Sequence, residues 1–264
     1  MTALSYVVND SATMLRRNLR HLLRYPSMTL MLAGMPVIFL LLFVYVFGGT
    51  LGAGLGGMSG GGRTAYANYV APGIILMTVA AVVQGTAVSV AMDMTEGIVA
   101  RFRTMAIFRA SVLTGHVLGT MIQAMLSIAV VVGVALLTGF RPTAGPLAWI
   151  AVVGILAMIT FALTWLAVAL GLVSKSVETA SNSPMFLVLL PFLGSGFVPT
   201  RSMPAGLRWF AEYQPFTPAT ETVRGLLMGT RIGGDAIITM AWSAGIALLA
   251  YVWARKLYSR DPVW

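Results

Sequence analysis

The charged residues of the chain are separated by six long apolar stretches. Each stretch contains 19 to 38 residues without Asp, Glu, Lys or Arg. A helix needs about 20 mostly apolar residues to cross about 30 Å of bilayer hydrocarbon. The pattern therefore predicts an all-α polytopic membrane protein with six transmembrane helices. Their expected cores are residues 28–47, 69–92, 112–137, 147–173, 179–198 and 236–254.

The polar segments predict how these spans are oriented. Six is an even number, so both termini are expected on the same side of the membrane. Of the 17 Lys and Arg residues, 11 fall on that side and the other 6 on the opposite side. Positive charge collects in the cytoplasmic segments of membrane proteins. We therefore expect a multi-pass protein of the cell (plasma) membrane with both termini in the cytoplasm.

The N-terminal segment predicts a basic amphipathic helix. In a helical projection Arg16, Arg17, Arg20 and Arg24 share one side, and the leucines lie on the other. Such a helix lies in the plane of the lipid head groups, with its arginines near anionic lipid. These arginines are the predicted membrane-surface anchor. The single transmembrane domain, 1–264, would then comprise this cytoplasmic helix (1–27), the six-span bundle (28–254) and a cytoplasmic tail (255–264).

The segment between the second and third spans predicts a second amphipathic helix, on the cytoplasmic side. Its apolar side chains, Ile98, Phe102 and Met105 among them, gather on one face, and charged side chains flank that face. A helix of this kind can dock into a groove on a partner protein. It can also rest on the lipid surface, and the residues alone leave both interpretations open.

Two segments depart from a regular span pattern. Residues 48–62 contain nine glycines, so we expect them not to form a helix. The fifth span is bracketed by Pro184 and Pro199 and interrupted by Pro191. It is long enough to cross the bilayer only if its helix begins near Glu178.

The segment between the fifth and sixth spans predicts two short helices. It is polar, yet it retains several aromatic and leucine side chains. One helix start is expected at Pro204, and a second has Thr217 as its N-cap with Pro218 following. Tyrosine and tryptophan also favour the interface between lipid and water. We therefore expect re-entrant helices that dip into the outer leaflet.

Composition excludes several classes of function. Only 9% of the residues are charged, against about 25% in soluble domains, which excludes a soluble enzyme, a disordered chain and a nucleic-acid-binding protein. Cysteine is absent, and neither His21 nor His116 has a second ligand at metal spacing. The chain lacks the Gly-Lys-Ser/Thr sequence that binds ATP phosphates. Residues 57–61 match G-x-S-x-G but lack the strand, acid and histidine that a nucleophile requires. We expect no catalytic residue, metal or cofactor in this chain.

The span interiors predict an apolar route. They contain no Asp, Glu, Lys or Arg, which argues against an ion-coupled carrier. Gln84 lies deep in the second span, where a helix-packing hydrogen bond is a more common role than substrate contact. Phenylalanines and the 17 methionines could line an adaptable route, or they could face lipid.

Short motifs occur in a specific order along the chain. They are LRYP at 23–26, EG at 96–97, RFRTM at 101–105, SGFVP at 195–199, MP at 203–204, LR at 207–208, QPFT at 214–217 and TVRGL at 222–226. With the order of the predicted elements, they make the chain resemble the ABC-2 permease family over essentially its whole length. The resemblance is to the membrane subunit of daunorubicin-resistance-type drug exporters in particular. In the family, Leu-Pro or Met-Pro often follows the arginine of the cytoplasmic segment between spans two and three. This chain has MAI at 105–107 instead.

The resemblance implies a mechanism in which this chain is a transport subunit and not an enzyme. ABC-2 permeases work as two six-span halves, each resting on a separate ATPase subunit that binds ATP and Mg²⁺. Closure of the two ATPase copies would push on the coupling helix and open a route at the interface between the permease halves. The implied ATPase-coupling residues are Glu96, Gly97, Arg101, Phe102, Arg103 and Met105. The implied route residues, on spans one, two and five, are Phe39, Phe43, Gln84, Phe186 and Phe192.

The resemblance favours export of hydrophobic drugs, antibiotics or lipids. A first alternative is an ABC-2 exporter of a lipid-linked glycan or another lipid. A second alternative is an ATP-independent carrier or a membrane assembly subunit, which a neighbouring ATPase gene would exclude. The second permease half could be a copy of this chain or a paralogue.

Overall fold

The computed structural model describes residues 26–54, 62–95 and 111–259, and every regular element in these residues is helical. Five helical stretches are long and apolar enough to cross a membrane. The first consists of α2 (Pro26–Leu41), the π-helical turn η1 (Leu42–Phe47) and α3 (Gly48–Gly54), and the others are α4 (Arg63–Thr95), α6 (Ser111–Leu137), α7 (Pro146–Val173) and α12 (Asp235–Ser259). The predicted all-helical membrane class is therefore confirmed, with five spans in place at the expected positions.

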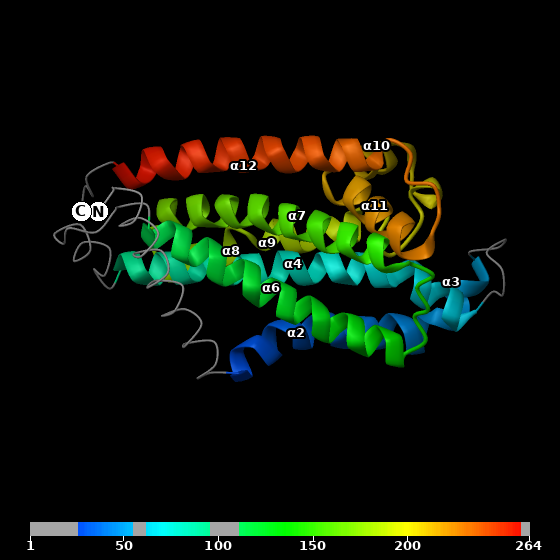
Figure 1. The fold of residues 1–264 in the computed structure, drawn as a ribbon. Coiled ribbons are helices and arrows are strands. Elements are labelled where there is room, and N and C mark those ends of the chain that lie inside the picture. The colour runs from blue at the N-terminus through cyan, green and yellow to red at the C-terminus, as the bar shows by residue number, and fades with distance from the viewer. Residues whose placement is uncertain (1–25, 55–61, 96–110, 260–264) are drawn as a thin grey trace.

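The long helices lie side by side around α4, as Figure 1 shows. α4 packs against α2, α6, α7 and α11, and most of its apolar stretch is buried. α12 packs mainly on α7 and is the least buried of the five. α2 and α12 lie on opposite sides of the bundle in Figure 1. We call the two ends of the bundle the Arg63 end and the Thr95 end, after the first and last residues of α4.

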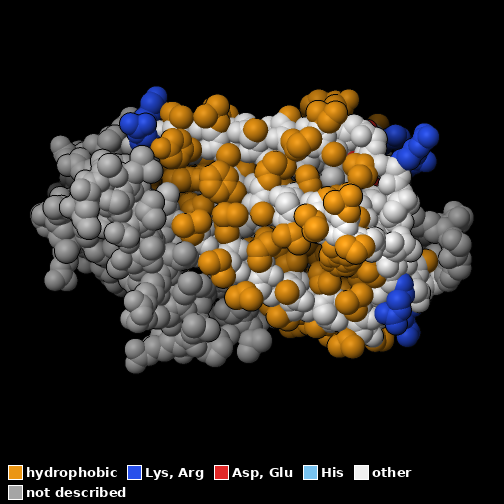
Figure 2. Space-filling model, viewed as in Figure 1, with side chains coloured by type: hydrophobic (Ala, Val, Ile, Leu, Met, Phe, Trp, Pro, Cys, Tyr) orange, Lys and Arg blue, Asp and Glu red, His pale blue; other side chains and the backbone are white. Residues whose placement is uncertain are grey.

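The surface of the bundle matches a membrane environment. In Figure 2 hydrophobic side chains cover the middle of the visible face, and Lys and Arg side chains appear only towards its ends. Large apolar side chains are exposed on α2, α7 and α12, including Ile38, Ile150 and Leu249. Exposed apolar surface on this scale is unfavourable in water and favourable in lipid.

Small residues allow the helices to approach α4 closely. A Cβ atom added to Gly171 of α7 would lie 2.7 Å from the carbonyl oxygen of Ala87 in α4. A Cβ atom on Gly73 of α4 would lie 2.5 Å from the carbonyl oxygen of Gly196. Both distances are shorter than van der Waals contact, so glycine is required where α7 crosses α4 and where the turn at Gly196 lies against α4.

The fifth predicted span is a broken helical segment. In place of one helix over residues 179–198, the structure has α8 (Val177–Asn182), α9 (Met185–Leu189) and the 3₁₀ turn η2 (Leu190–Leu193). Pro184 and Pro191 lie at the breaks, where a proline supplies no N–H for helical hydrogen bonding. The start near Glu178 agrees with the sequence expectation, but the continuous helix does not form.

Two other expectations are corrected at the Arg63 end. The first seven residues of the glycine-rich segment do form a helix, α3, because the helix continues from η1 and packs against α4. A Cβ atom on Gly52 would overlap the backbone of Gly62, so glycine supports this packing. The other correction concerns the start of one helix in the polar outer segment, which forms the turn η3 (Thr200–Ser202) and two short helices as predicted, α10 (Ala205–Tyr213) and α11 (Phe216–Met228).

The two helices of this outer segment begin close to the predicted residues. α10 begins directly after Pro204, as expected. α11 begins at Phe216 and not after Thr217, because the Oε1 atom of Gln214 accepts the Phe216 N–H at 3.0 Å. The Thr217 hydroxyl instead accepts a hydrogen bond from the Ser195 N–H at 3.3 Å.

Candidate transport site

Four phenylalanines from α2 and the broken fifth segment form an aromatic cluster. They are Phe39 on α2, Phe43 on η1, Phe192 on η2 and Phe197 in the turn that follows. The rings of Phe192 and Phe197 stack with centroids 4.4 Å apart. Phe43 lies 4.7 Å from Phe197, and Phe39 lies 5.5 Å from Phe192. Aromatic pairs at these separations attract each other beyond their burial alone.

The aromatic cluster contains three of the five predicted route residues. Phe39, Phe43 and Phe192 meet there, and Phe197 joins them although the sequence did not mark it as a route residue. Phe186 lies on α9 with nearly half of its surface exposed, outside the cluster. Gln84 donates a 2.8 Å hydrogen bond to the carbonyl oxygen of Ser181 on α8. That contact is the helix-packing role that we considered the more common one for Gln84.

The cluster lies behind an open apolar face. Ile38 and Leu42 of α2 and η1, and Leu189 of α9, are exposed around it. η1 is a π-helical turn, which widens the helix where Phe43 turns towards Phe197. No Asp, Glu, Lys or Arg lies on α2, η1, α9 or η2, so the helices that carry the cluster are uncharged.

At the Arg63 end, Arg224 of α11 fastens the outer segment to α4. The side chain is 6% exposed, and its guanidinium lies 4.0 Å above the ring of Tyr69. It donates to the carbonyl oxygens of Tyr69 at 3.0 Å and Ser195 at 2.7 Å, and it pairs with Glu221 at 2.6 Å. We call Arg224, Tyr69, Ser195 and Glu221 the arginine clasp.

Further contacts hold the turn that carries Phe197. The Tyr69 hydroxyl donates to the Ser195 carbonyl oxygen at 2.9 Å, and the Tyr66 hydroxyl donates to that of Phe197 at 3.1 Å. The Nε2 atom of Gln214 donates to the Leu190 carbonyl oxygen at 3.2 Å. These bonds fix the positions of η2 and the following turn, and therefore of Phe192 and Phe197. The aromatic cluster is thus held in place from α4 and α11.

At the Thr95 end, a hydrogen-bonded pair of side chains joins α4 to α6. The Nε2 atom of His116 lies 2.9 Å from Oδ2 of Asp93, and both side chains are 12% exposed. Asp93 lies two residues before the end of α4, and His116 lies five residues after the start of α6. The pair therefore ties together the two helices from which the predicted coupling segment leaves and returns.

The remaining predicted residues lie outside the described part of the chain. These are the anchor residues Arg16, Arg17, Arg20 and Arg24, and the coupling residues Glu96, Gly97, Arg101, Phe102, Arg103 and Met105. Within residues 26–54, 62–95 and 111–259, no group of three or more His, Asp or Glu side chains is arranged to hold a metal ion.

These features define a helical membrane protein with an apolar aromatic cluster and a fastened outer segment. Comparison with known proteins assigns its family. The ABC-2 type transporter family matches residues 11–228, and the chain belongs to this family. It is 28% identical over 253 residues to a daunorubicin resistance ABC transporter permease protein, DrrB1, of Streptomyces coeruleorubidus. That match covers 95% of this chain and 86% of the relative.

A second similarity covers less of the chain. It is to a probable doxorubicin resistance ABC transporter permease protein, DrrC, of Mycobacterium tuberculosis, at 27% identity over 159 residues. That match covers 59% of this chain and 56% of the relative. Both relatives are permeases of ABC transporters, so the chain is a membrane permease related to drug-resistance transporters.

Proposed function

We propose that this chain is the membrane-spanning permease subunit of an ATP-driven exporter of hydrophobic drugs or antibiotics, or of lipids. The observation that carries the proposal is the aromatic cluster, which lies behind an exposed apolar face and has no charged residue on its helices. Apolar walls with aromatic rings suit a hydrophobic cargo that enters from the bilayer. The relatives' names, which refer to daunorubicin and doxorubicin resistance, support the same cargo class.

The proposal includes a sixth crossing of the membrane. The segment Val177–Leu193 is apolar but short, and the turn up to residue 198 extends it towards the Arg63 end. Irregular backbone is tolerated at membrane depth where it is buried in protein. With this crossing both termini lie in the cytoplasm, the Thr95 end is the cytoplasmic end, and α10 and α11 are the re-entrant outer helices.

The energy source is a separate ATPase subunit in two copies, which bind ATP and Mg²⁺. In the proposal these copies contact residues 96–105 of two permease halves, each a copy of this chain or a paralogue. Force on that segment enters α4 and α6, which the Asp93–His116 pair joins. α4 then carries the displacement to the arginine clasp and the aromatic cluster.

Transport by reconstituted protein tests the proposal. The permease and its ATPase, placed together in vesicles, should export hydrophobic drugs and hydrolyse ATP faster when the drug is present. Phe192→Ala removes the stacked partner of Phe197 and should raise the drug concentration for half-maximal stimulation about threefold or more. Phe161→Ala, on the exposed part of α7, is the matched control and should leave it unchanged. Equal effects of the two variants would refute the role of the cluster.

Coupling is tested by a second pair of measurements. Arg101→Glu combined with Phe102→Ala should reduce co-purification of the ATPase while membrane insertion stays intact. Unchanged association and unchanged transport would remove these residues from the coupling interface. A permease that transports without any ATPase would favour the ATP-independent alternative. Transport of a lipid-linked glycan but no drug would favour the glycan exporter.

A further inference from the structure

The turn that carries Phe197 is held unevenly at its two ends. The carbonyl oxygen of Ser195 accepts two donors, the Tyr69 hydroxyl at 2.9 Å and the Arg224 guanidinium at 2.7 Å. The carbonyl oxygen of Phe197 accepts the Tyr66 hydroxyl at 3.1 Å, and no other donor reaches it from the residues that the structure describes. Loss of one donor therefore leaves the Ser195 carbonyl bonded, whereas the Phe197 carbonyl depends on Tyr66.

The residue before Phe197 gives its ring little support. A Cβ atom on Gly196 would lie 2.9 Å from the Pro191 carbonyl oxygen and 3.3 Å from the Cα atom of Gly73 in α4, so this position requires glycine. Glycine has more backbone freedom than any other residue, so it does not fix the direction of the chain that follows. A contact from outside the turn is therefore needed to hold the Phe197 ring in one place.

Phe197 is the central ring of the aromatic cluster. It stacks on Phe192 with an angle of 3° between the two rings, and it also contacts Phe43. It is 3% exposed, so the other rings pack around it. The attraction between aromatic rings depends on their separation and tilt. Movement of the Phe197 peptide therefore disturbs both ring contacts at once.

Tyr66 is a rigid point on α4 from which to hold this ring. Its side chain is fully buried, and its ring stacks on that of Tyr69 with centroids 6.5 Å apart. Its N–H donates to the Gly62 carbonyl oxygen at 3.1 Å, in the first turn of α4. Buried side chains in a close-packed interior are held in one rotamer. The Tyr66 hydroxyl therefore moves with α4.

We propose that Tyr66 is a positioning residue of the transport site. Its hydroxyl fixes Phe197, and through that ring it sets the affinity of the aromatic cluster for cargo. Tyr66 is buried and does not touch the cargo itself. A displacement of α4 during the ATPase cycle then moves the Phe197 ring and changes the affinity. This inference rests on the proposed function, because it requires that cargo contacts the aromatic cluster.

A fluorine label on the Phe197 ring tests the positioning without any cargo. The ¹⁹F resonance of 4-fluorophenylalanine at position 197 depends on the ring current of the stacked Phe192. Tyr66→Phe keeps the ring and removes the hydroxyl, so it should shift or split this resonance. Tyr69→Phe is the matched control, because Arg224 still bonds the turn, and it should leave the resonance in place. 4-Aminophenylalanine at position 66 retains an N–H donor and should restore the wild-type resonance.

Drug-stimulated ATP hydrolysis in the vesicles described above tests the effect on cargo. The probe is the drug that stimulates the wild-type transporter most strongly. Tyr66→Phe should raise its half-maximal concentration about two- to fivefold, while the maximal rate stays the same. In a Phe197→Ala background the same substitution should add almost nothing, because substitutions that act through one contact are not additive.

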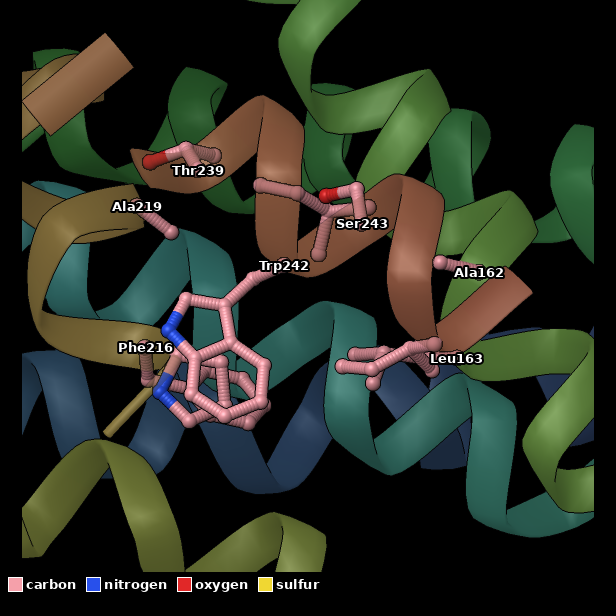
Figure 3. Close-up of a pocket in the computed structure, with 10 residues that line it drawn as sticks. Ala162, Leu163, Phe216, Ala219, Thr239, Trp242 and Ser243 are labelled. Atoms are coloured by element: carbon pink, nitrogen blue, oxygen red, sulfur yellow. The ribbon is translucent and has the colours of Figure 1, made fainter. Parts of the chain in front are cut away.

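Trp242 provides an aromatic control on the other side of the bundle. It lines a small pocket with Leu163 of α7 and Phe216 of α11, and Figure 3 shows its indole extending from α12. α12 packs mainly on α7, opposite α2. Trp242→Phe therefore changes an aromatic side chain outside the aromatic cluster. It should alter neither the fluorine resonance nor the half-maximal drug concentration.

Two results would overturn the inference. One is an unchanged fluorine resonance in Tyr66→Phe, and the other is an equal rise in half-maximal concentration with and without the Phe197 ring. The Tm of Tyr66→Phe should fall by no more than about 4 °C, so a folded protein is compared in each case. If Phe197→Ala has no effect on drug stimulation, the cargo role of the cluster fails instead. The fluorine measurement then still decides whether Tyr66 positions the ring.

Discussion

The arginine clasp predicts a large difference in stability between two arginine substitutions. Arg224→Gln removes a guanidinium that bonds two buried carbonyl oxygens, those of Tyr69 and Ser195. The Ser195 carbonyl oxygen keeps the Tyr69 hydroxyl as a donor, but each hydrogen bond lost from the charged guanidinium costs about 1–2 kcal/mol. Glu221 is 36% exposed, so its lost ion pair adds at most about 1 kcal/mol after solvent screening. The free energy of unfolding should fall by about 2–4 kcal/mol.

Thermal denaturation in mild detergent measures this effect. A loss of about 2–4 kcal/mol corresponds to a decrease in Tm of about 5–15 °C for a chain of this size. Arg224→Lys keeps the charge but cannot bond both carbonyl oxygens through a planar fork, so its Tm should be intermediate. Arg208→Gln is the matched control, because its ion pair with Glu212 is exposed on both sides, and its Tm should change by less than about 2 °C.

The same experiment can refute the reasoning. If Arg224→Gln and Arg208→Gln shift the Tm equally, the buried hydrogen bonds do not stabilise the outer segment. A Tm of Arg224→Gln within about 2 °C of the wild type would lead to the same conclusion. A lowered Tm with unchanged drug-stimulated ATP hydrolysis at low temperature would assign the clasp to stability alone.

Two further predictions concern contacts of α4 with its neighbours. Gly73→Ala places a Cβ atom 2.5 Å from the Gly196 carbonyl oxygen, so the Tm should fall by several degrees. Gly154→Ala on α7 has open space around the new atom and should leave the Tm unchanged or slightly raised, because alanine favours helix. His116→Leu removes the 2.9 Å bond to Asp93 and should lower the free energy of unfolding by about 1–3 kcal/mol in denaturant titration. His116→Gln retains a donor and should recover most of that loss, and equal losses in both variants would argue against the hydrogen bond.

The sequence predicted those parts of the fold that depend on local composition. The charge-free stretches located five spans to within a few residues, because a bilayer requires a minimum length of apolar helix. The fifth stretch is as free of charged residues as the other five, but Pro184 and Pro191 interrupt its helix. The glycine count misled us at α3, because the propensity of residues 48–54 is overridden by packing against α4.

The contacts that position the site could not be predicted from a single sequence. Arg224 bonds a carbonyl oxygen 155 residues away, and Tyr66 bonds one 131 residues away. Nothing in the local pattern of either residue indicates the partner. Three predicted route residues meet in the aromatic cluster, and they were predicted because they lie on spans that the family resemblance assigned to the route. Phe197 was part of a quoted motif, but its stacking on Phe192 depends on the turn between them.

α4 has 33 residues, which as a helix extend about 50 Å, well beyond about 30 Å of hydrocarbon. A helix longer than the bilayer adjusts by tilting or by thickening the lipid around it. Because α4 carries the Asp93–His116 pair near one end and contacts the arginine clasp near the other, any change in its tilt moves both. We therefore expect bilayer thickness to change the rate of the transport cycle. Vesicles of shorter and longer acyl chains should give different rates of drug-stimulated ATP hydrolysis, and equal rates would show that α4 does not respond to thickness.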